Sequence, residues 1–268
     1  MNKVVGFIGA GNMGQAIVGG IIKSGLITSN NIIMSDLYVP SLDSAKEKYK
    51  IQVTTNNKEV ATKSNILILA VKPNLYDTVI DEIKDIVKED VLIVTIAAGM
   101  SIESTEKSFV RNLKIIRTMP NTPALVGEGM TAICSNKLVT KEEVNEIATL
   151  LSSFGEVEVV SEKLIDAVTS VSGSSPAYVY MFIEAMADGA VLQGMPRDKA
   201  YKFAAQTVLG SAKMVLETGL HPGVLKDMVC SPGGTTIEAV AELEARGLRS
   251  SVISAMNKCY EKSQKMSK

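Results

Sequence analysis

The sequence predicts an α/β protein with a doubly wound parallel sheet over residues 1–161 and an all-helical domain over residues 162–268. Three observations support this. Short apolar runs alternate with helical patterns in the first part, a glycine-rich turn follows the first run, and the second part contains no convincing strand. Continuous apolar runs are typical of strands covered on both faces, as in a parallel sheet. The length of 268 residues allows two domains.

The elements of the first part follow one another in a regular order. Each apolar run is short, and each segment between two runs carries apolar residues at helical spacing. This rhythm places a ligand in the crevice at the carboxyl ends of the strands. The expected strands are 4–8, 31–35, 66–71, 91–96, 114–118 and 130–134, and the expected helices are 12–24, 41–49, 75–88, 101–109 and 140–153.

The second part is divided into helices by breaks at Gly194, at Gly219–Gly223 and at Ser231–Gly234. Its segment Met181–Val191 is apolar nearly all round, so we expect it to be buried in its own domain or against another subunit. A helical stretch of this size makes a small core, and a helical dimer interface would enlarge it. The expected helices are 163–170, 175–192, 197–218, 223–229, 235–246 and 249–266.

A G-x-G-x-x-G pattern follows the first expected strand directly. Gly9 permits a tight turn, Gly11 lets a pyrophosphate approach the backbone, and Gly14 lets the next helix pack close to the strand. The helix N-terminus then directs unpaired N–H groups at the phosphates. The pattern predicts a Rossmann-like dinucleotide site; the alternative is a purely structural glycine turn. The full turn consists of Gly9, Ala10, Gly11, Asn12, Met13 and Gly14.

Two further loops follow strands and are expected to line the same crevice. Small residues at such positions let a flat cofactor ring approach the backbone, whereas the alternative for each loop is simply a tight turn. Three such loops at strand ends favour a site. Lys72, before a proline in an exposed turn, is expected to be solvated. The loops are Ala70-Val71-Lys72-Pro73 and Ala97-Ala98-Gly99.

The end of the second strand bears on the choice between NAD and NADP. An acid there accepts a hydrogen bond from the ribose 2′-hydroxyl, whereas a basic residue accommodates the 2′-phosphate. Asp36 favours NAD if its side chain points into the site. A shift by one residue would present Ser35 instead, which tolerates a phosphate. Residues 32–45 contain no Arg or Lys, which weakly disfavours strict NADP use.

Two loops of the second part open helices. In Ser231–Thr236, paired glycines allow successive N–H groups to form an anion-binding nest, and Thr235 with Glu238 has the spacing of a capping box. Such a loop holds a small carboxylate without a basic side chain; the alternative is a well-capped helix start. In Val171–Tyr178, Pro176 is expected in the first turn of the helix, and the alternative is a joint that leads into a packed helix.

Composition excludes several classes of function. A net charge of −1 gives no reason to expect a nucleic acid or an anionic membrane as partner, and no apolar run is long enough for a membrane span. Cys134, Cys230 and Cys259 form no metal or disulfide pattern and suit a reducing cytoplasm. The single histidine, His221, lies in a Gly/Pro turn, where a turn role is expected. Since Met1–Lys3 enter the first strand directly, we expect no signal peptide.

Taken together, the motifs of the whole chain resemble those of pyrroline-5-carboxylate reductase. The resemblance follows the expected order from end to end, and the loop before the 235–246 helix is its most specific part. The motifs are Phe7–Gly14, Ala70–Pro73, Ala97–Gly99, Met119-Pro120-Asn121-Thr122-Pro123-Ala124, Val171–Tyr178, His221-Pro222-Gly223 with Leu225-Lys226-Asp227, and Ser231–Ile237.

This resemblance implies reduction of the cyclic imine 1-pyrroline-5-carboxylate to L-proline by NADPH or NADH, the final step of proline biosynthesis. It also implies a helical domain that forms a homodimer, sometimes assembled into a ring of dimers, with helices of the partner completing the crevice. Asp36 departs from what members that prefer NADPH would carry.

The resemblance further implies roles for individual residues. The substrate carboxylate would bind the loop of Ser231, Gly233, Gly234, Thr235 and Thr236, and the Thr236 hydroxyl would bond the ring nitrogen. Residues 9–14 would hold the pyrophosphate, while Ser35 and Asn57 would lie on the adenosine side. The loops 70–73 and 97–99 would flank the nicotinamide and its ribose.

Two alternatives remain open at this level. A 3-hydroxyacid-type dehydrogenase pairs a similar first domain with helices but uses a helix-borne lysine, and residues 172–192 contain none. A non-catalytic module that senses NAD(P) would leave the loop at 231–236 without a purpose.

Overall fold

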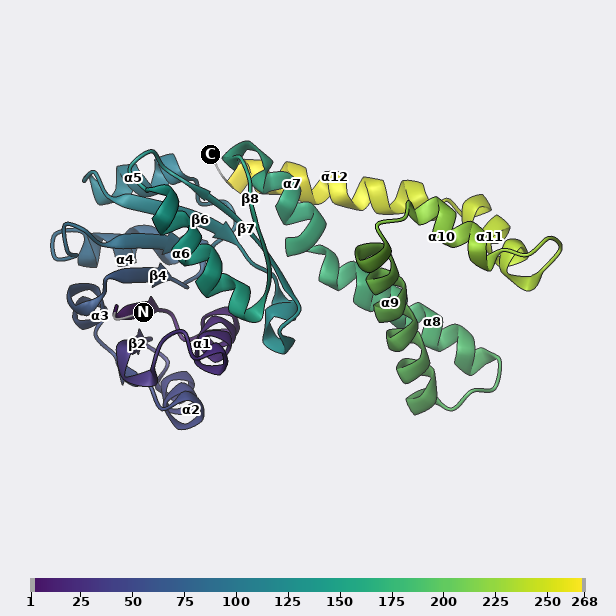
Figure 1. Cartoon of the computed structure of the whole chain (residues 1–268), viewed down its shortest axis with the longest axis horizontal. Coiled ribbons are helices and arrows are strands. Elements are labelled where there is room, and N and C mark those ends of the chain that lie inside the picture. Colours follow the sequence, from purple (N-terminus) through teal and green to yellow (C-terminus); the bar gives the residue numbers. More distant parts are fainter. Residues whose placement is uncertain (1–2, 267–268) are drawn as a thin grey trace. The chain divides into compact units, whose positions relative to one another are not determined.

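The chain folds into two compact units, drawn in Figure 1 from a computed structural model that describes residues 3–266. The first unit comprises the described residues up to Ser174 together with those from Cys259 onward, and the second comprises Ser175–Lys258. The segment after residue 161 begins within the first unit because Ile165 joins its hydrophobic core. The domain boundary expected at 161/162 stays a prediction.

The first unit is built on an eight-stranded sheet of order β3-β2-β1-β4-β5-β6-β7-β8. This order confirms the doubly wound arrangement, and all six expected strands are present. The strands are β1 (Val5–Ile8), β2 (Ile32–Ser35), β3 (Gln52–Thr54), β4 (Ile66–Leu69), β5 (Leu92–Thr95), β6 (Lys114–Met119), β7 (Gly129–Ser135) and β8 (Gly155–Val159).

One pair departs from the expected parallel sheet, since β7 runs antiparallel to β6. Their connection, Pro120–Glu128, is shorter than the roughly dozen residues that a parallel crossover needs. It contains only the short 3₁₀ helix Thr122–Val126. The other neighbouring strands are parallel.

Both edge strands, β3 and β8, lack a continuous apolar run and were therefore not expected from the sequence. The positions of β3 and β8 are half-buried or exposed, whereas those of β1, β2, β4 and β5 are all buried. An edge strand packs on fewer neighbours, so its sequence need not be apolar. Helix α3 (Asn57–Lys63) was also missed, being only seven residues long; the Asn56 side chain caps it by accepting from Lys58 N–H.

Helices cover both faces of the sheet and form two buried clusters. One cluster contains Ile17, Leu42 and Ile147, so it lies beneath α1, α2 and α6. The other contains Val60, Ile80 and Phe109, beneath α3, α4 and α5. The helices are α1 (Asn12–Ser24), α2 (Val39–Tyr49), α4 (Tyr76–Ile83, shorter than expected), α5 (Ile102–Phe109) and α6 (Lys141–Leu151).

The second unit is helical throughout, as expected, with the last helix passing into the first unit. Among residues 3–266, no helix is both long and apolar enough to traverse a lipid bilayer. The expected helix 163–170 lies in the first unit as α7 (Ile165–Val168), followed by a π-helical turn, Thr169–Gly173. The others are α8 (Ser175–Leu192), α9 (Arg197–Thr218), α10 (Pro222–Val229), α11 (Thr235–Ala245) and α12 (Leu248–Met266).

The second unit buries little of its apolar surface within one chain. Helices α8 and α9 pack on each other, and the residues that they bury are all alanines, namely Ala187, Ala200 and Ala204. Met181 is 68% exposed and Phe203 is 63% exposed. Burial of Met181–Val191 within its own domain, one of the two expectations, is therefore wrong, because the small α8–α9 seam leaves the larger side chains outside.

Candidate functional site

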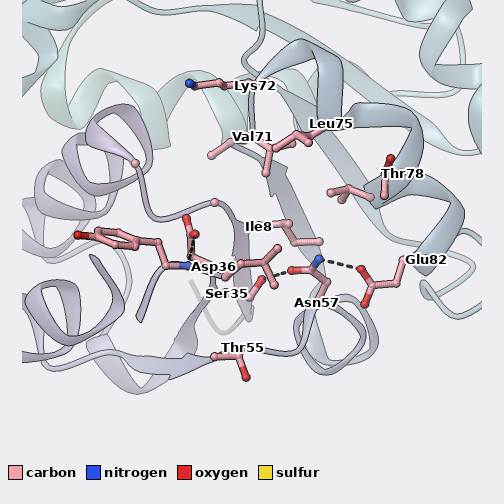
Figure 2. A pocket seen from close by; sticks show the side chains of 16 residues that line it. Ile8, Ser35, Asp36, Thr55, Asn57, Val71, Lys72, Leu75, Thr78 and Glu82 are labelled. Carbon is pink, nitrogen blue, oxygen red and sulfur yellow. Dashed lines mark hydrogen bonds between the residues drawn. The ribbon is translucent and has the colours of Figure 1, made fainter. Parts of the chain in front are cut away.

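A cavity of about 610 Å³ opens at the carboxyl ends of β1, β2 and β4, where the doubly wound sheet predicts a ligand. Its wall is formed by the glycine turn, the end of β2, the start of α3, the loop after β4, and α4 (Figure 2). Seven of the site residues expected from the sequence line it, and the rest do not. The seven are Gly9, Gly11, Ser35, Asn57, Ala70, Val71 and Lys72.

The three glycines of the turn have the geometry that each expected role requires. Gly9 has a φ of +111°, and a Cβ there would lie 2.5 Å from the Ala70 carbonyl oxygen. A Cβ on Gly14 would lie 2.6 Å from the Gly9 oxygen, so α1 packs tightly on the turn. A Cβ on Gly11 would meet nothing within 4 Å. The backbone is thus open at Gly11 alone of the three, where a pyrophosphate would approach.

The N-terminus of α1 leaves its first N–H groups available to an anion. Its N-cap is Gly11, which has no side chain to accept from them, and the first turn holds no acidic residue. The positive end of the helix dipole therefore acts on whatever lies over the turn. The cradle fits the phosphates of a dinucleotide in shape and in charge.

The glycine turn is tied to the end of β2 by two hydrogen bonds. Gly9 N–H donates to the Ser35 carbonyl oxygen at 2.7 Å, and Ala10 N–H donates to Asp36 Oδ2 at 2.6 Å. The other carboxylate oxygen, Asp36 Oδ1, accepts from Tyr38 N–H at 2.8 Å. Asp36 is therefore held at the wall of the cavity, whose exposed apolar lip includes Leu37 and Tyr38.

A chain of three polar side chains crosses the base of the cavity in Figure 2. The buried Ser35 hydroxyl donates to Asn57 Oδ1 at 2.7 Å, and Asn57 Nδ2 donates to Glu82 Oε2 at 2.9 Å. Glu82 was not expected from the sequence, because a single acidic residue on an exposed helical face matches no binding motif. Asn57 is thereby oriented from both sides.

The two loops after β4 and β5 have different surroundings. Ala70, Val71 and Lys72 line the cavity, and Lys72 is exposed, as expected for a solvated lysine. Ala97 is buried in the core, and Gly99 has a φ of +78° with the end of α12 packed against it. A Cβ on Gly99 would lie 2.7 Å from that of Met266. The loop 97–99 therefore lies outside this cavity.

The loop Ser231–Thr236 belongs to the second unit. Gly234 N–H donates to the Ser231 carbonyl oxygen at 3.0 Å, and Gly233 has a φ of +64°, as in a type II turn with Pro232 before it. Helix α11 begins at Thr235 with Gly234 as its N-cap, and no side chain caps it. The expected capping box of Thr235 and Glu238 is wrong, because Thr235 lies one residue inside the helix. The uncapped N–H groups can therefore meet a carboxylate.

Other residues singled out in the sequence have structural roles. His221 is the N-cap of α10, and its Nδ1 accepts from Gly223 N–H at 3.0 Å, which confirms the turn role. Pro176 lies in the first turn of α8, as expected. The buried Asn121 joins two segments of the first unit, donating to the Ser172 carbonyl oxygen and accepting from Met130 N–H.

Two family patterns match the chain. The pattern described as pyrroline-5-carboxylate reductase dimerisation matches residues 162–266, and that described as NADP oxidoreductase, coenzyme F420-dependent, matches residues 4–99. The pyrroline-5-carboxylate reductase of Escherichia coli strain K12 is 54% identical over 271 residues, which span all of both chains.

Solved structures agree over the full length. A pyrroline-5-carboxylate reductase from Coxiella burnetii is 35% identical with a TM-score of 0.92, covering all of both chains. A pyrroline carboxylate reductase from Plasmodium falciparum, solved with NADP bound, is 33% identical with a TM-score of 0.92, covering 100% of this chain and 99% of that one. On this full-length similarity in sequence and structure, the chain belongs to the pyrroline-5-carboxylate reductase family.

Proposed function

We propose that this protein reduces 1-pyrroline-5-carboxylate to L-proline with NADPH or NADH, the final step of proline biosynthesis. One observation supports the proposal above all: a single chain of this family carries both features. They are the glycine turn that is open at Gly11 and the loop Ser231–Thr236, which leads into an uncapped helix. The first fits a dinucleotide pyrophosphate, and the second fits a small carboxylate. Family membership argues against a 3-hydroxyacid-type dehydrogenase.

The first unit holds the nicotinamide cofactor in this proposal. Residues 9–14 bind the pyrophosphate through the N-terminus of α1. The adenosine lies along the end of β2, beside Asn57 and the apolar lip of the cavity, while the loops 70–73 and 97–99 flank the nicotinamide and its ribose. When bound, the reduced nicotinamide supplies a hydride to the imine carbon.

The second unit holds the substrate carboxylate through N–H groups at the start of α11, with Ser231, Gly233, Gly234 and Thr235 shaping the loop. Thr236 is half-buried in the first turn of that helix, and its hydroxyl hydrogen-bonds the ring nitrogen. A hydrogen bond or a proton at that nitrogen makes the neighbouring carbon more electrophilic. The imine gains a hydride at carbon and a proton at nitrogen, so no nucleophile of the protein is required.

The working form in this proposal is a homodimer, with rings of dimers as the larger assembly. Exposed apolar side chains such as those of Met181 and Phe203 support it, since a monomer rarely leaves so much apolar surface in water. The helical domain starts at residue 162 in this view. We place the protein in the cytoplasm, with no nucleic acid or membrane as partner.

The test is an assay of NADH and NADPH oxidation with 1-pyrroline-5-carboxylate against a panel of oxo acids. We expect turnover with the imine and formation of proline. Turnover with a 3-hydroxyacid or oxo-acid pair but none with the imine would reject the proposal. Cofactor binding without any turnover would favour a sensing module.

A further inference from the structure

We infer that Asp36 makes this protein select NADH over NADPH, by fixing a carboxylate where the 2′-phosphate of NADPH would lie. The inference rests on the proposed use of a nicotinamide cofactor in the cavity of the first unit. Asp36 directly follows β2 and lines that cavity beside the glycine turn. An acid at this point of a doubly wound sheet faces the adenosine ribose and accepts from its 2′-hydroxyl.

The Asp36 side chain is held in one orientation by two backbone donors. Oδ2 accepts from Ala10 N–H at 2.6 Å, and Oδ1 accepts from Tyr38 N–H at 2.8 Å. An ionised carboxylate has about four acceptor positions, so about two remain for ribose hydroxyls. Because both donors belong to the backbone, the carboxylate cannot swing away from a phosphate without giving up these bonds.

The neighbouring Ser35 is not available to bind a 2′-phosphate, the alternative that the sequence left open. Its side chain is fully buried, and its hydroxyl donates to Asn57 Oδ1 at 2.7 Å. In Figure 2, Ser35 points toward Asn57. A 2′-phosphate would therefore meet the Asp36 carboxylate rather than the serine hydroxyl.

Among the residues that line the cavity, no positively charged side chain lies beside Asp36, where it could offset the charge of a 2′-phosphate. Among these lining residues, all within the described part of the chain, Lys72 is the only cation, and it comes from the loop after β4 (Figure 2). The residues from Leu37 to Leu42 are uncharged, although an NADP site commonly places an Arg nearby. A 2′-phosphate with a charge of about −1.5 to −2 would face Asp36 without compensation.

The test measures binding of NADH and NADPH separately by titration calorimetry in the absence of imine. We expect the wild type to bind NADH at least about tenfold more tightly than NADPH, and Asp36→Asn to reduce that ratio by at least about tenfold. Asparagine keeps one oxygen acceptor for the backbone donors while removing the charge. The matched control, Glu47→Gln, removes an exposed carboxylate of α2 that does not line the cavity and should change the ratio by less than about twofold.

A second variant covers the case in which Asp36→Asn fails to fold. Leu37 is 85% exposed, so Leu37→Arg adds a cation at the cavity lip without disturbing the core and should raise NADPH affinity relative to NADH. Equal affinities in the wild type, an equal loss for both cofactors in Asp36→Asn, or an equal ratio change in Glu47→Gln would overturn the inference. Failure to reduce the imine would reject the proposed function and leave these binding ratios intact.

Discussion

Alanine substitutions at two glycines of the turn, Gly11 and Gly9, should affect cofactor binding and folding differently. At Gly11 an added Cβ meets no atom within 4 Å, and the backbone has a φ of −70°, which alanine adopts without strain. We therefore expect Gly11→Ala to change the free energy of unfolding by less than about 1 kcal/mol. The same methyl group would occupy the space through which a pyrophosphate approaches the backbone.

Gly9→Ala is the contrasting variant. A φ of +111° is strained for alanine, and the new Cβ would lie 2.5 Å from the carbonyl oxygen of Ala70, a backbone atom that cannot rotate away. Strain of this kind costs about 1–3 kcal/mol before the steric clash is added, so we expect at least about 2 kcal/mol of destabilisation.

Two measurements on each protein decide the outcome. Denaturant unfolding gives the stability, and calorimetric titration with NADH and NADPH gives the affinities. We expect Gly11→Ala to lose at least about tenfold in affinity for both cofactors, which corresponds to about 1.4 kcal/mol, with near wild-type stability. Wild-type affinity in a folded Gly11→Ala protein would refute placement of the pyrophosphate over this turn.

Three further predictions concern substrate, helix caps and thiols. Thr236→Ala should lower kcat for imine reduction substantially while the circular dichroism spectrum stays unchanged; wild-type turnover would reject the role of the Thr236 hydroxyl. Thr140→Ala, which breaks the capping box of α6 with Glu143, should cost about 1 kcal/mol of unfolding free energy. Thr235→Ala, its control, should cost far less, because the Thr235 side chain caps nothing; equal costs would contradict this. Burial raises the pKa of the Cys134 thiol to about 12, so alkylation at pH 8 should spare it until the protein unfolds, and labelling of the native protein would show otherwise.

The sequence was informative wherever one local pattern determined the structure. The glycine turn is such a pattern, because each of its three glycines has a separate local reason: a positive φ at Gly9, close packing at Gly14 and open space for a ligand at Gly11. Helices α1, α8 and α9 end at the expected residues, since caps and breaks are also local signals. Strands β1, β2, β4 and β5 were visible because burial on both faces leaves only apolar residues.

Features that depend on contacts distant in sequence could not be predicted. The pairing direction of β7 depends on where its neighbour lies, and edge strand β8 has no apolar run. One local signal also failed: the capping box expected at Thr235 has the right residue types, but α11 starts at that residue, so the pattern is one position out of register. The family resemblance places Ser35 and Asn57 on the adenosine side, but no sequence pattern joins them to Glu82. Only the folded structure brings the three side chains into one hydrogen-bonded chain.

The hydrogen bond from Ala10 N–H to Asp36 limits the substitutions that could change the cofactor preference from NADH to NADPH. The Asp36 carboxylate holds the buried Ala10 N–H, and an unsatisfied buried donor costs about 1–3 kcal/mol. Replacement by arginine, the residue that best accommodates a 2′-phosphate, supplies no acceptor and would loosen the turn that binds the pyrophosphate. A short neutral acceptor such as asparagine removes the repulsion and keeps one bond. A stable route to NADPH use therefore neutralises position 36 first and adds the cation at a neighbour such as Leu37.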